Sequence, residues 1–449
     1  MSTFDLILRG GTVVTPECAR LADVGVSEGK IAALEHNLSG HTRREINAIG
    51  LHIFPGLIDA HVHFNEPGRT DWEGIETGSR ALAAGGGTLF FDMPLNAHPP
   101  TCDGEGFGLK LAAARRNSLT DFAFWGGLVP QNLDRLEDLA GRGVIGFKAF
   151  MSNSGIEDFD CVDEKTLREG MKRAAKLNLP VAVHAESEAL TKRLAEEKIA
   201  AGTVSVRDYL ESRPVAAELE AIRRAIELAG ETQCALHIVH ISSGAGIALV
   251  THAKKSGLDV TCETCPHYLT LTETDVETLG AVAKCAPPLR TKAVQEELWL
   301  KLFGGEITMV GSDHSPSPPE MKMGKNFFKV WGGISGVQHT FPLLLDGGTQ
   351  RHVALSLIAS LTSFNVAKRF RLPKTKGRIE VGADADLAML DLAQGFTVRA
   401  EDLFYRHRQS PYTGRTLTGR VVQTILRGTP IFTDGKIVGA NRGQLIRPL

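Results

Sequence analysis

Short runs of alternating apolar and polar residues mark the two ends of the chain. The N-terminal part contains "FDLILRGGTVV" and "ADVGVSEGKIAALE", and the C-terminal part contains "GRIEVGADADLAMLDL" and "VVQTILRGTPIFTDGKIVGA". Alternation with a period of two, interrupted by Gly-Gly, Glu-Gly-Lys and Asp-Gly-Lys turns, predicts β-strands. Because both ends share this pattern and the middle does not, we expect one small β-sandwich domain assembled from both termini.

The middle of the chain, from about residue 54 to 370, changes between strand-like and helix-like segments. Apolar runs such as "GGTLFFDMP" and "LPVAVHAE" alternate with helical patterns such as "DEKTLREGMKRAAKL" and "VAAELEAIRRAIELA". This alternation predicts parallel βαβ units in an α/β fold, and its length favours a TIM-like (β/α)8 barrel. A doubly wound open sheet is the alternative, but no GxGxxG or GxxxxGK[ST] motif supports its nucleotide-binding form. We expect the barrel at residues 54–375, with the β-domain at residues 1–53 and 376–449.

The composition limits the location and the partners. The chain has 449 residues, 43% of them hydrophobic, and a formal net charge of −2. This near-neutral charge gives no electrostatic basis for binding nucleic acid or an anionic membrane. The start, "MSTFDLILRGGTVV", lacks the features of a signal peptide, and no apolar stretch approaches the roughly 20 residues that cross a bilayer. We therefore expect a cytoplasmic protein without nucleic-acid or membrane partners.

The cysteines are dispersed and odd in number, unlike a disulfide framework. They are Cys18, Cys102, Cys161, Cys234, Cys262, Cys265 and Cys285. Cys262 and Cys265 form a single CxxC, and a structural zinc site needs a second pair of ligands. We interpret all of them as reduced thiols, with zinc binding or redox use as the alternative.

Metal-capable or basic side chains follow five of the apolar runs, where a barrel enzyme places its active site. They are His61 and His63 after "FPGLID", Lys148 in "GVIGFKAF", His184 in "PVAVHAE", His240 in "LHIVHIS" and Asp313 in "ITMVGSDHS". Any one of them alone is more often a hydrogen-bonded structural residue than a ligand. Together, four histidines, a carboxylate and a lysine at one end of one predicted barrel indicate a site for two divalent ions.

The two ions would share these residues unequally. The expected sets are His61, His63 and Asp313 for one ion, and His184 and His240 for the other. Two cations held close together need a bridging carboxylate, and the strand that carries Lys148 offers no Asp or Glu. A lysine carboxylated by CO2 would supply the bridge and would explain a lysine that ends an apolar run, because an unpaired buried ammonium is costly. An unmodified Lys148 paired with Asp or Glu is the alternative.

Other side chains near these positions are not counted as ligands. His237 precedes His240 by three residues, so we expect it on the opposite face of its strand. His314 follows Asp313 directly and is expected to point away from it. Glu263 and His267 lie in and beyond the next strand, and the pattern indicates no role for either of them.

Five motifs occur in a fixed order over residues 55–318: "DAHVHFNEPG", "GFKAF", "VHAE", "HIVHIS" and "GSDHSP". They resemble the cyclic-amidohydrolase branch of the amidohydrolase superfamily, which contains dihydroorotases, allantoinases and hydantoinases or dihydropyrimidinases. The resemblance implies hydrolysis of a ring amide in a small molecule at a binuclear centre, usually of zinc, with cobalt or manganese as alternatives. It also implies that carboxylated Lys148 bridges the ions and that the chain forms a homotetramer or dimer. Asp313 is then the expected catalytic residue, which takes and returns a proton.

The residues beside the metal motifs distinguish the members of this branch. Dihydroorotases resemble HxHxREPG and use the arginine for a substrate carboxylate, whereas Asn65 stands at that position here. The DHAPH-like histidine of that group is also replaced, because "DHSPS" places Ser315 and Ser317 after the barrel aspartate. Hydantoinases resemble HTHLxMPFGG and carry a tyrosine soon after the bridging lysine, whereas this chain has "FNEPGR" and "KAFMSNSG". Both groups fit less well and stay as alternatives.

Several other segments resemble those of allantoinases: residues 61–78, Met93–Asn96, Asp313–Lys322, Trp331–Gly336 and Tyr405–Arg415. This resemblance implies opening of the hydantoin ring of allantoin to give allantoate. Asn, Ser and main-chain groups suit such a neutral ligand, which is rich in donors and acceptors. By family position, the expected substrate contacts are Asn96, Ser315, Ala286 and Gly332. A non-catalytic scaffold relative that has lost its metal ligands is the alternative from another class, and the complete ligand set argues against it.

Overall fold

The computed structural model describes residues 3–449, and a barrel of parallel strands lies at its centre. In chain order its strands are β8 (Leu57–Val62), β9 (Gly87–Asp92), β10 (Asp121–Phe124), β11 (Gly126–Gly127), β12 (Phe147–Phe150), β13 (Val181–His184), β14 (Leu236–Ile238), β15 (Val260–Thr264) and β16 (Met309–Val310). β10 and β11 are two parts of one strand interrupted at Trp125, and the pairings between neighbouring strands are parallel. The ring closes beyond β16, where the His63 amide donates to the His314 carbonyl at 2.8 Å. The expected (β/α)8 barrel is confirmed.

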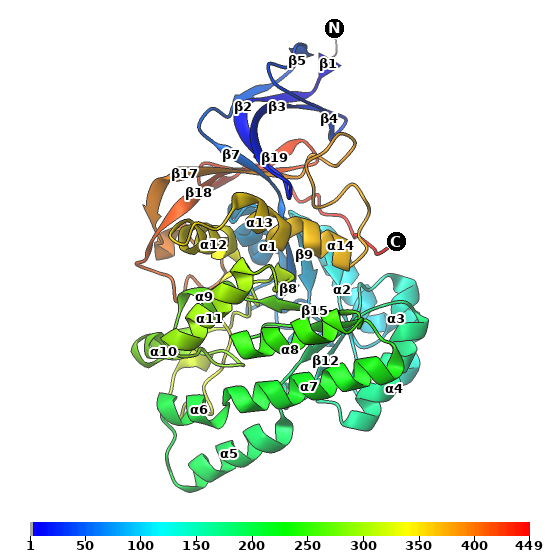
Figure 1. The fold of residues 1–449 in the computed structure, drawn as a ribbon, viewed down its shortest axis with the longest axis vertical. Coiled ribbons are helices and arrows are strands. Elements are labelled where there is room, and N and C mark those ends of the chain that lie inside the picture. The colour runs from blue at the N-terminus through cyan, green and yellow to red at the C-terminus, as the bar shows by residue number, and fades with distance from the viewer. Residues whose placement is uncertain (1–2) are drawn as a thin grey trace.

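Helices follow each barrel strand and cover its outer face. They are α1 (Ile75–Ala84), α2 (Gly104–Asn117), α3 (Leu136–Arg142), α4 (Glu164–Lys176), α5 (Glu188–Ala200), α6 (Val206–Ser212), α7 (Val215–Thr232), α8 (Gly244–Lys255), α9 (Pro266–Thr270), α10 (Glu273–Leu279), α11 (Lys292–Phe303), α12 (Thr340–Thr349), α13 (Leu355–Ala359) and α14 (Asn365–Arg369). α4, α7 and α8 lie side by side along the outside of the barrel (Figure 1). The side chains of Asp163 and Ser243 begin α4 and α8 as N-caps, because each accepts a hydrogen bond from a first-turn amide. Among the described residues, no helix combines the length and the apolar character needed to cross a membrane.

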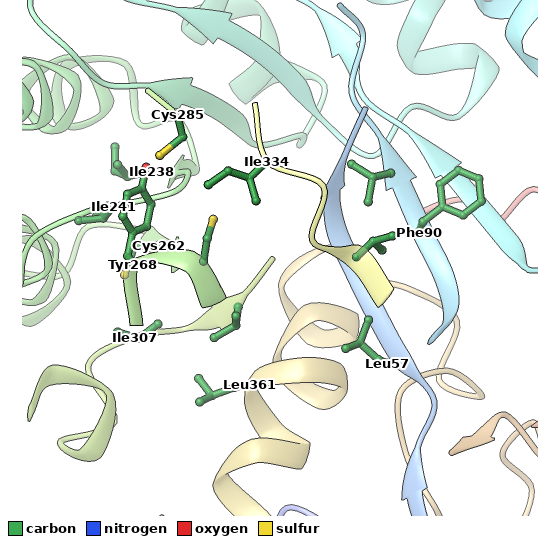
Figure 2. Close-up of a cluster of buried hydrophobic side chains, with 14 of the residues drawn as sticks. Leu57, Phe90, Ile238, Ile241, Cys262, Tyr268, Cys285, Ile307, Ile334 and Leu361 are labelled. Carbon is green, nitrogen blue, oxygen red and sulfur yellow. The ribbon is translucent and has the colours of Figure 1, made fainter. Parts of the chain in front are cut away.

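The layer between the barrel and the helices is the main hydrophobic core. Figure 2 shows part of it, in which Cys262, Tyr268 and Cys285 lie near Ile238 and Ile241. All seven cysteines are free thiols. Burial raises the pKa of the Cys262 thiol to about 11, so it is an unreactive part of the core.

The two ends of the chain form one sheet at the far end of the molecule, with blue and orange strands side by side in Figure 1. Its members are β2 (Leu6–Val14), β3 (Ala19–Ser27), β4 (Lys30–Glu35), β6 (Glu45–Asn47), β7 (His52–Pro55), β17 (Leu387–Thr397), β18 (Thr416–Leu426), β19 (Thr429–Thr433) and β20 (Lys436–Ile437); β1 (Thr3–Phe4) and β5 (His41–Thr42) pair separately. The antiparallel pair β7–β17 joins the N-terminal half to the C-terminal half. A β-domain built from both termini is thus confirmed, whereas its boundary residues stay a prediction.

A buried ion-pair network fastens this sheet to the barrel. Lys376 Nζ lies 2.7 Å from an oxygen of Asp121 and 2.7 Å from an oxygen of Asp386. Arg427 also donates to Asp121, at 2.6 Å. Since Asp121 is the first residue of β10, this network lies at the amino ends of the barrel strands. The predicted ligands lie at the opposite end of the strands, which the connection between β17 and β18 also reaches: Gln409 donates to the Ser317 carbonyl at 2.9 Å, and the rings of Tyr405 and His314 lie 5.0 Å apart.

Candidate active site

Two histidines of β8 and the loop after it meet an aspartate beyond β16. The Nε2 atoms of His61 and His63 lie 3.2 Å and 3.4 Å from Asp313 Oδ1. One ligand atom from each of these residues lies within 4.8 Å of the others. Two imidazole nitrogens and a carboxylate oxygen at this spacing form a cluster that could hold a divalent metal ion.

The Asp313 carboxylate is largely buried, with 13% of its side chain exposed, and is ionised at neutral pH. Burial alone would raise its pKa, but the neighbouring His61 and a hydrogen bond from His63 lower the pKa to about 2. Its backbone φ of 46° lies in the left-handed region, which an aspartate occupies only where the surrounding structure holds it. This turn aims the carboxylate at the two imidazoles, whereas His314 turns away and accepts a hydrogen bond at Nδ1 from the Gly336 amide at 3.2 Å.

A second pair of histidines stands beside the first. His184 Nδ1 and His240 Nε2 are 3.0 Å apart, and the rings of His240 and His61 lie 5.4 Å apart. The other nitrogen of His184, Nε2, donates to Glu186 at 2.8 Å, and Arg213 pairs with the same carboxylate. Burial lowers the pKa of both His184 and His240. Both rings are therefore neutral at neutral pH, which is the form that binds a metal.

Lys148 lies in β12 and is completely buried. Its Nζ has no hydrogen-bond partner within residues 3–449, and the Phe150 ring lies 5.1 Å away. The alternative of a lysine paired with Asp or Glu is therefore absent from the described part of the chain. Burial lowers the Lys148 pKa to about 8, which leaves more of the amine unprotonated than in free lysine. The unprotonated amine is the form that reacts with CO2.

The sequence indicated no role for Glu263, which holds His61 in place, or for His237, which contacts Glu263. Glu263 accepts a hydrogen bond from His61 Nδ1 and lies 3.3 Å from His237 Nε2. The expectation that His237 faces away from His240 is wrong: β14 ends at Ile238 and His240 has a φ of 38°, so strand alternation does not continue to it. The alternation of Thr261 and Glu263 along β15 could have indicated that both face the barrel interior.

We expect Glu263→Gln to weaken metal binding by about 10- to 100-fold, because glutamine cannot supply the negative charge that orients His61. The measurement is competition between the protein and a chelator for zinc. Glu218→Gln is the matched control, since Glu218 is also buried but accepts from Ser242 and Ser243. Equal zinc affinity in the two variants would contradict this role for Glu263.

A cavity of about 340 Å³ opens onto the histidines and Asp313. Its lining includes all four predicted substrate contacts: Asn96, Ser315, Ala286 and Gly332. The Asn96 amide nitrogen lies 3.5 Å from Ser315 Oγ, which places two neutral polar groups side by side on the wall. A larger, open hollow of about 1010 Å³ lies between α1, α12 and the β17–β18 pair, away from the predicted ligands.

Asn65 is not among the described residues that line the cavity. Its side-chain amide donates to the Pro316 carbonyl at 3.4 Å, and its φ is 64°. In the sequence, Asn65 stands where a dihydroorotase would carry its carboxylate-binding arginine. That arginine is still missing, but the amide beside the cavity belongs to Asn96.

The fold and this site define the class of protein. The model of the amidohydrolase family matches residues 52–438. The chain belongs to this family, which consists of hydrolytic enzymes. Among solved structures, the L-hydantoinase (dihydropyrimidinase) from Arthrobacter aurescens superimposes with a TM-score of 0.96, at 34% identity over 99% of this chain and 100% of that chain.

The curated relatives are more specific. The allantoinase of Rubrobacter xylanophilus is 56% identical over 449 residues, which cover 100% of this chain and 98% of the relative. The allantoinase of Deinococcus radiodurans is 54% identical over 447 residues, which cover 99% of each chain. Both alignments therefore include the β-domain as well as the barrel.

Proposed function

We propose that this protein is an allantoinase, which hydrolyses the ring amide of allantoin to give allantoate. The observation that carries the proposal is the cavity in which Asn96, Ser315 and main-chain groups face the His–Asp cluster. Full-length identity of 56% to an allantoinase supports the same substrate, compared with 34% to a hydantoinase of known structure. A homotetramer or dimer stays a prediction.

The donor set fits two divalent ions, and zinc is the proposed metal, with cobalt or manganese as alternatives. The proposed holders of the ions are His61, His63, Lys148 in carboxylated form, His184, His240 and Asp313. The unpartnered Lys148 Nζ, within residues 3–449, supports the carboxylated form because a carbamate needs a free amine. When bound, such ions would lower the pKa of a water molecule and polarise the ring carbonyl.

The protein's own side chains then transfer the proton and keep the histidine rings in the orientation that binds the ions. Asp313 accepts the proton of the attacking water at its carboxylate and returns it to the departing ring nitrogen. Glu263 and Glu186 fix which nitrogen of His61 and His184 is protonated. Asn96 offers a donor and an acceptor to the ring and its ureido group.

Among the described residues, three cations line the cavity: Arg213, Lys284 and the exposed Lys329, of which the first two are engaged by the protein itself. Arg213 is paired with the buried Glu186, whose pKa burial would raise but Arg213 and His184 hold at about 2. Lys284 donates to two main-chain carbonyl oxygens. Neither Arg213 nor Lys284 is therefore free to pair with a substrate carboxylate such as that of dihydroorotate, which leaves Lys329 as the one uncommitted cation among the described residues of the lining.

We expect the purified protein to open allantoin with a kcat/KM at least about 100-fold above its values for hydantoin, dihydrouracil and dihydroorotate. The physical reason is that, of these four substrates, only allantoin carries a neutral ureido group that can form hydrogen bonds with the polar groups of the cavity wall. The measurement is the initial rate of ring opening for the four substrates under one set of conditions. Preferred turnover of hydantoin or dihydrouracil would support the hydantoinase alternative. Preferred turnover of dihydroorotate would refute the inference that the cavity offers no suitable cation to a substrate carboxylate.

A further inference from the structure

Lys284 is a buried lysine beside the cavity, and the sequence indicated no role for it. Only 5% of the residue is exposed. Its Nζ donates to the carbonyl oxygens of Phe327 and Val330, both at 2.6 Å, and lies 4.4 Å from the centre of the Tyr209 ring. Among the described residues no carboxylate pairs with it. Two carbonyl dipoles and an aromatic face thus replace part of the water that the amine loses on burial, although burial still lowers its pKa to about 7.

The main chain of the same residue holds the other end of this loop. The Gly333 amide donates to the Lys284 carbonyl at 2.7 Å. Lys284 therefore fastens residues 327–333 at three points, two through its side chain and one through its backbone. Trp331 and Gly332, between these points, line the cavity, as does Ala286 two residues after Lys284.

The loop also approaches the rest of the site closely. A Cβ atom added at Gly333, where φ is 109°, would lie 2.1 Å from the Ser315 carbonyl oxygen. Only glycine lets the loop come this near to Ser315. A small outward movement of the loop would therefore widen the cavity between Gly332 and both Ser315 and Ala286.

We propose that Lys284 is a positioning residue for the substrate: it clamps the 327–333 loop against the 284–286 segment and so sets the width of the cavity. The substrate part of this proposal rests on the proposed allantoinase function, whereas the clamping of the loop does not. Lys284 lies outside the metal ligands, so its removal should affect binding of the substrate more than the chemical step.

Lys284→Met keeps an unbranched side chain and removes the three N–H donors. We expect KM for allantoin to rise about tenfold or more while kcat changes less than about threefold, the pattern of lost ground-state binding. The readouts are steady-state kinetics, zinc content and the rate of trypsin cleavage at Lys325 and Lys329. Cleavage should become at least about fivefold faster in the variant, because protease access follows local opening.

Lys325→Met is the matched control, since Lys325 lies two residues before the 327–333 loop and is exposed. We expect this control to keep the wild-type KM, and cleavage is then compared at Lys329, which both variants retain. Lys284→Arg, which keeps a cation with several donors, should give a KM between those of the wild type and the methionine variant. If Lys284→Met does not fold, KM and the cleavage rate are measured on Lys284→Arg instead.

Three results would overturn the proposal: a wild-type KM in both Lys284 variants, faster cleavage without any change in KM, or equal losses in zinc content and kcat. The last result would mean that Lys284 supports the whole site rather than the loop. Absence of allantoin turnover in the wild type would refute the proposed function instead. Trypsin cleavage would still test the clamp in that case, and KM would be measured with whichever ring amide the wild type opens.

Discussion

Asp313→Asn is expected to lower kcat for allantoin about 10⁴-fold while leaving the protein folded. Asparagine has nearly the same shape as aspartate, and its amide oxygen can still face the Nε2 atoms of His61 and His63, which now lie 3.2 Å and 3.4 Å from Asp313 Oδ1. It cannot accept the proton of a water molecule and return it to the departing nitrogen. The Asp313 carboxylate, whose pKa is about 2, is poised to do both at neutral pH.

The measurement combines kcat, zinc content and the thermal unfolding midpoint of the same preparation. We expect the unfolding midpoint to stay close to that of the wild type and most of the zinc to remain, because His61 and His63 are unchanged. A kcat within tenfold of the wild type would contradict the assignment of Asp313. Loss of all zinc would show that Asp313 acts as an essential ligand and would leave its proton-transfer role to be tested by rates measured at saturating zinc.

Lys148→Met is expected to abolish turnover, by at least about 10³-fold, and to make the metal-free protein more stable. Methionine fills a similar volume, but it cannot be carboxylated and cannot bridge two ions. Burial holds the pKa of Lys148 at about 8 instead of its ordinary 10.5, so the folded state binds the proton less tightly than the unfolded state. The resulting penalty is complete below pH 8 and disappears as the pH rises towards 10.5.

This penalty amounts to about 3 kcal/mol in metal-free, CO2-free protein at pH 7, from about 1.4 kcal/mol for each pKa unit. We therefore expect Lys148→Met to raise the free energy of unfolding by roughly that amount under these conditions. Chemical denaturation of both metal-free proteins measures it, and zinc binding with kcat measures the functional loss. The same substitution at Lys165, which is exposed on α4, is the control and should change neither property. Normal zinc content with normal kcat in Lys148→Met would contradict a bridging lysine.

The barrel and the β-domain could be predicted from the sequence because their patterns are local. Strands that are covered on both faces appear in the sequence as continuous runs of apolar residues. In the amphipathic helices α4 and α7 between them, the apolar residues recur with helical spacing. That both ends of the chain join one β-domain was also predictable, since both alternate with a period of two, whereas the particular pairing of β7 with β17 was not. The ends of the strands were harder to predict from the sequence. β16, for example, has only two residues, and the loop after it is held by a hydrogen bond from the Ser312 amide to Asp59 of β8.

The candidate site was predictable where ligands end apolar runs, and less so where the backbone leaves regular strand geometry. His240 and Asp313 both have positive φ values, which no alternation rule anticipates. His237 was misplaced for this reason. Glu263 and Lys284 are held by contacts with residues distant in the chain, His61 in one case and Phe327 and Val330 in the other.

The central claim is that the protein opens allantoin at a metal centre, and one measurement on the same preparation tests both parts. Allantoate formation is followed before metal removal, after complete removal with a chelator, and after addition of zinc, with bound metal measured at each stage. We predict about two equivalents of divalent metal per chain in the active protein, loss of allantoate formation on removal, and recovery with zinc. Full turnover by metal-free protein, or no allantoate from protein that holds its metal, would contradict the claim.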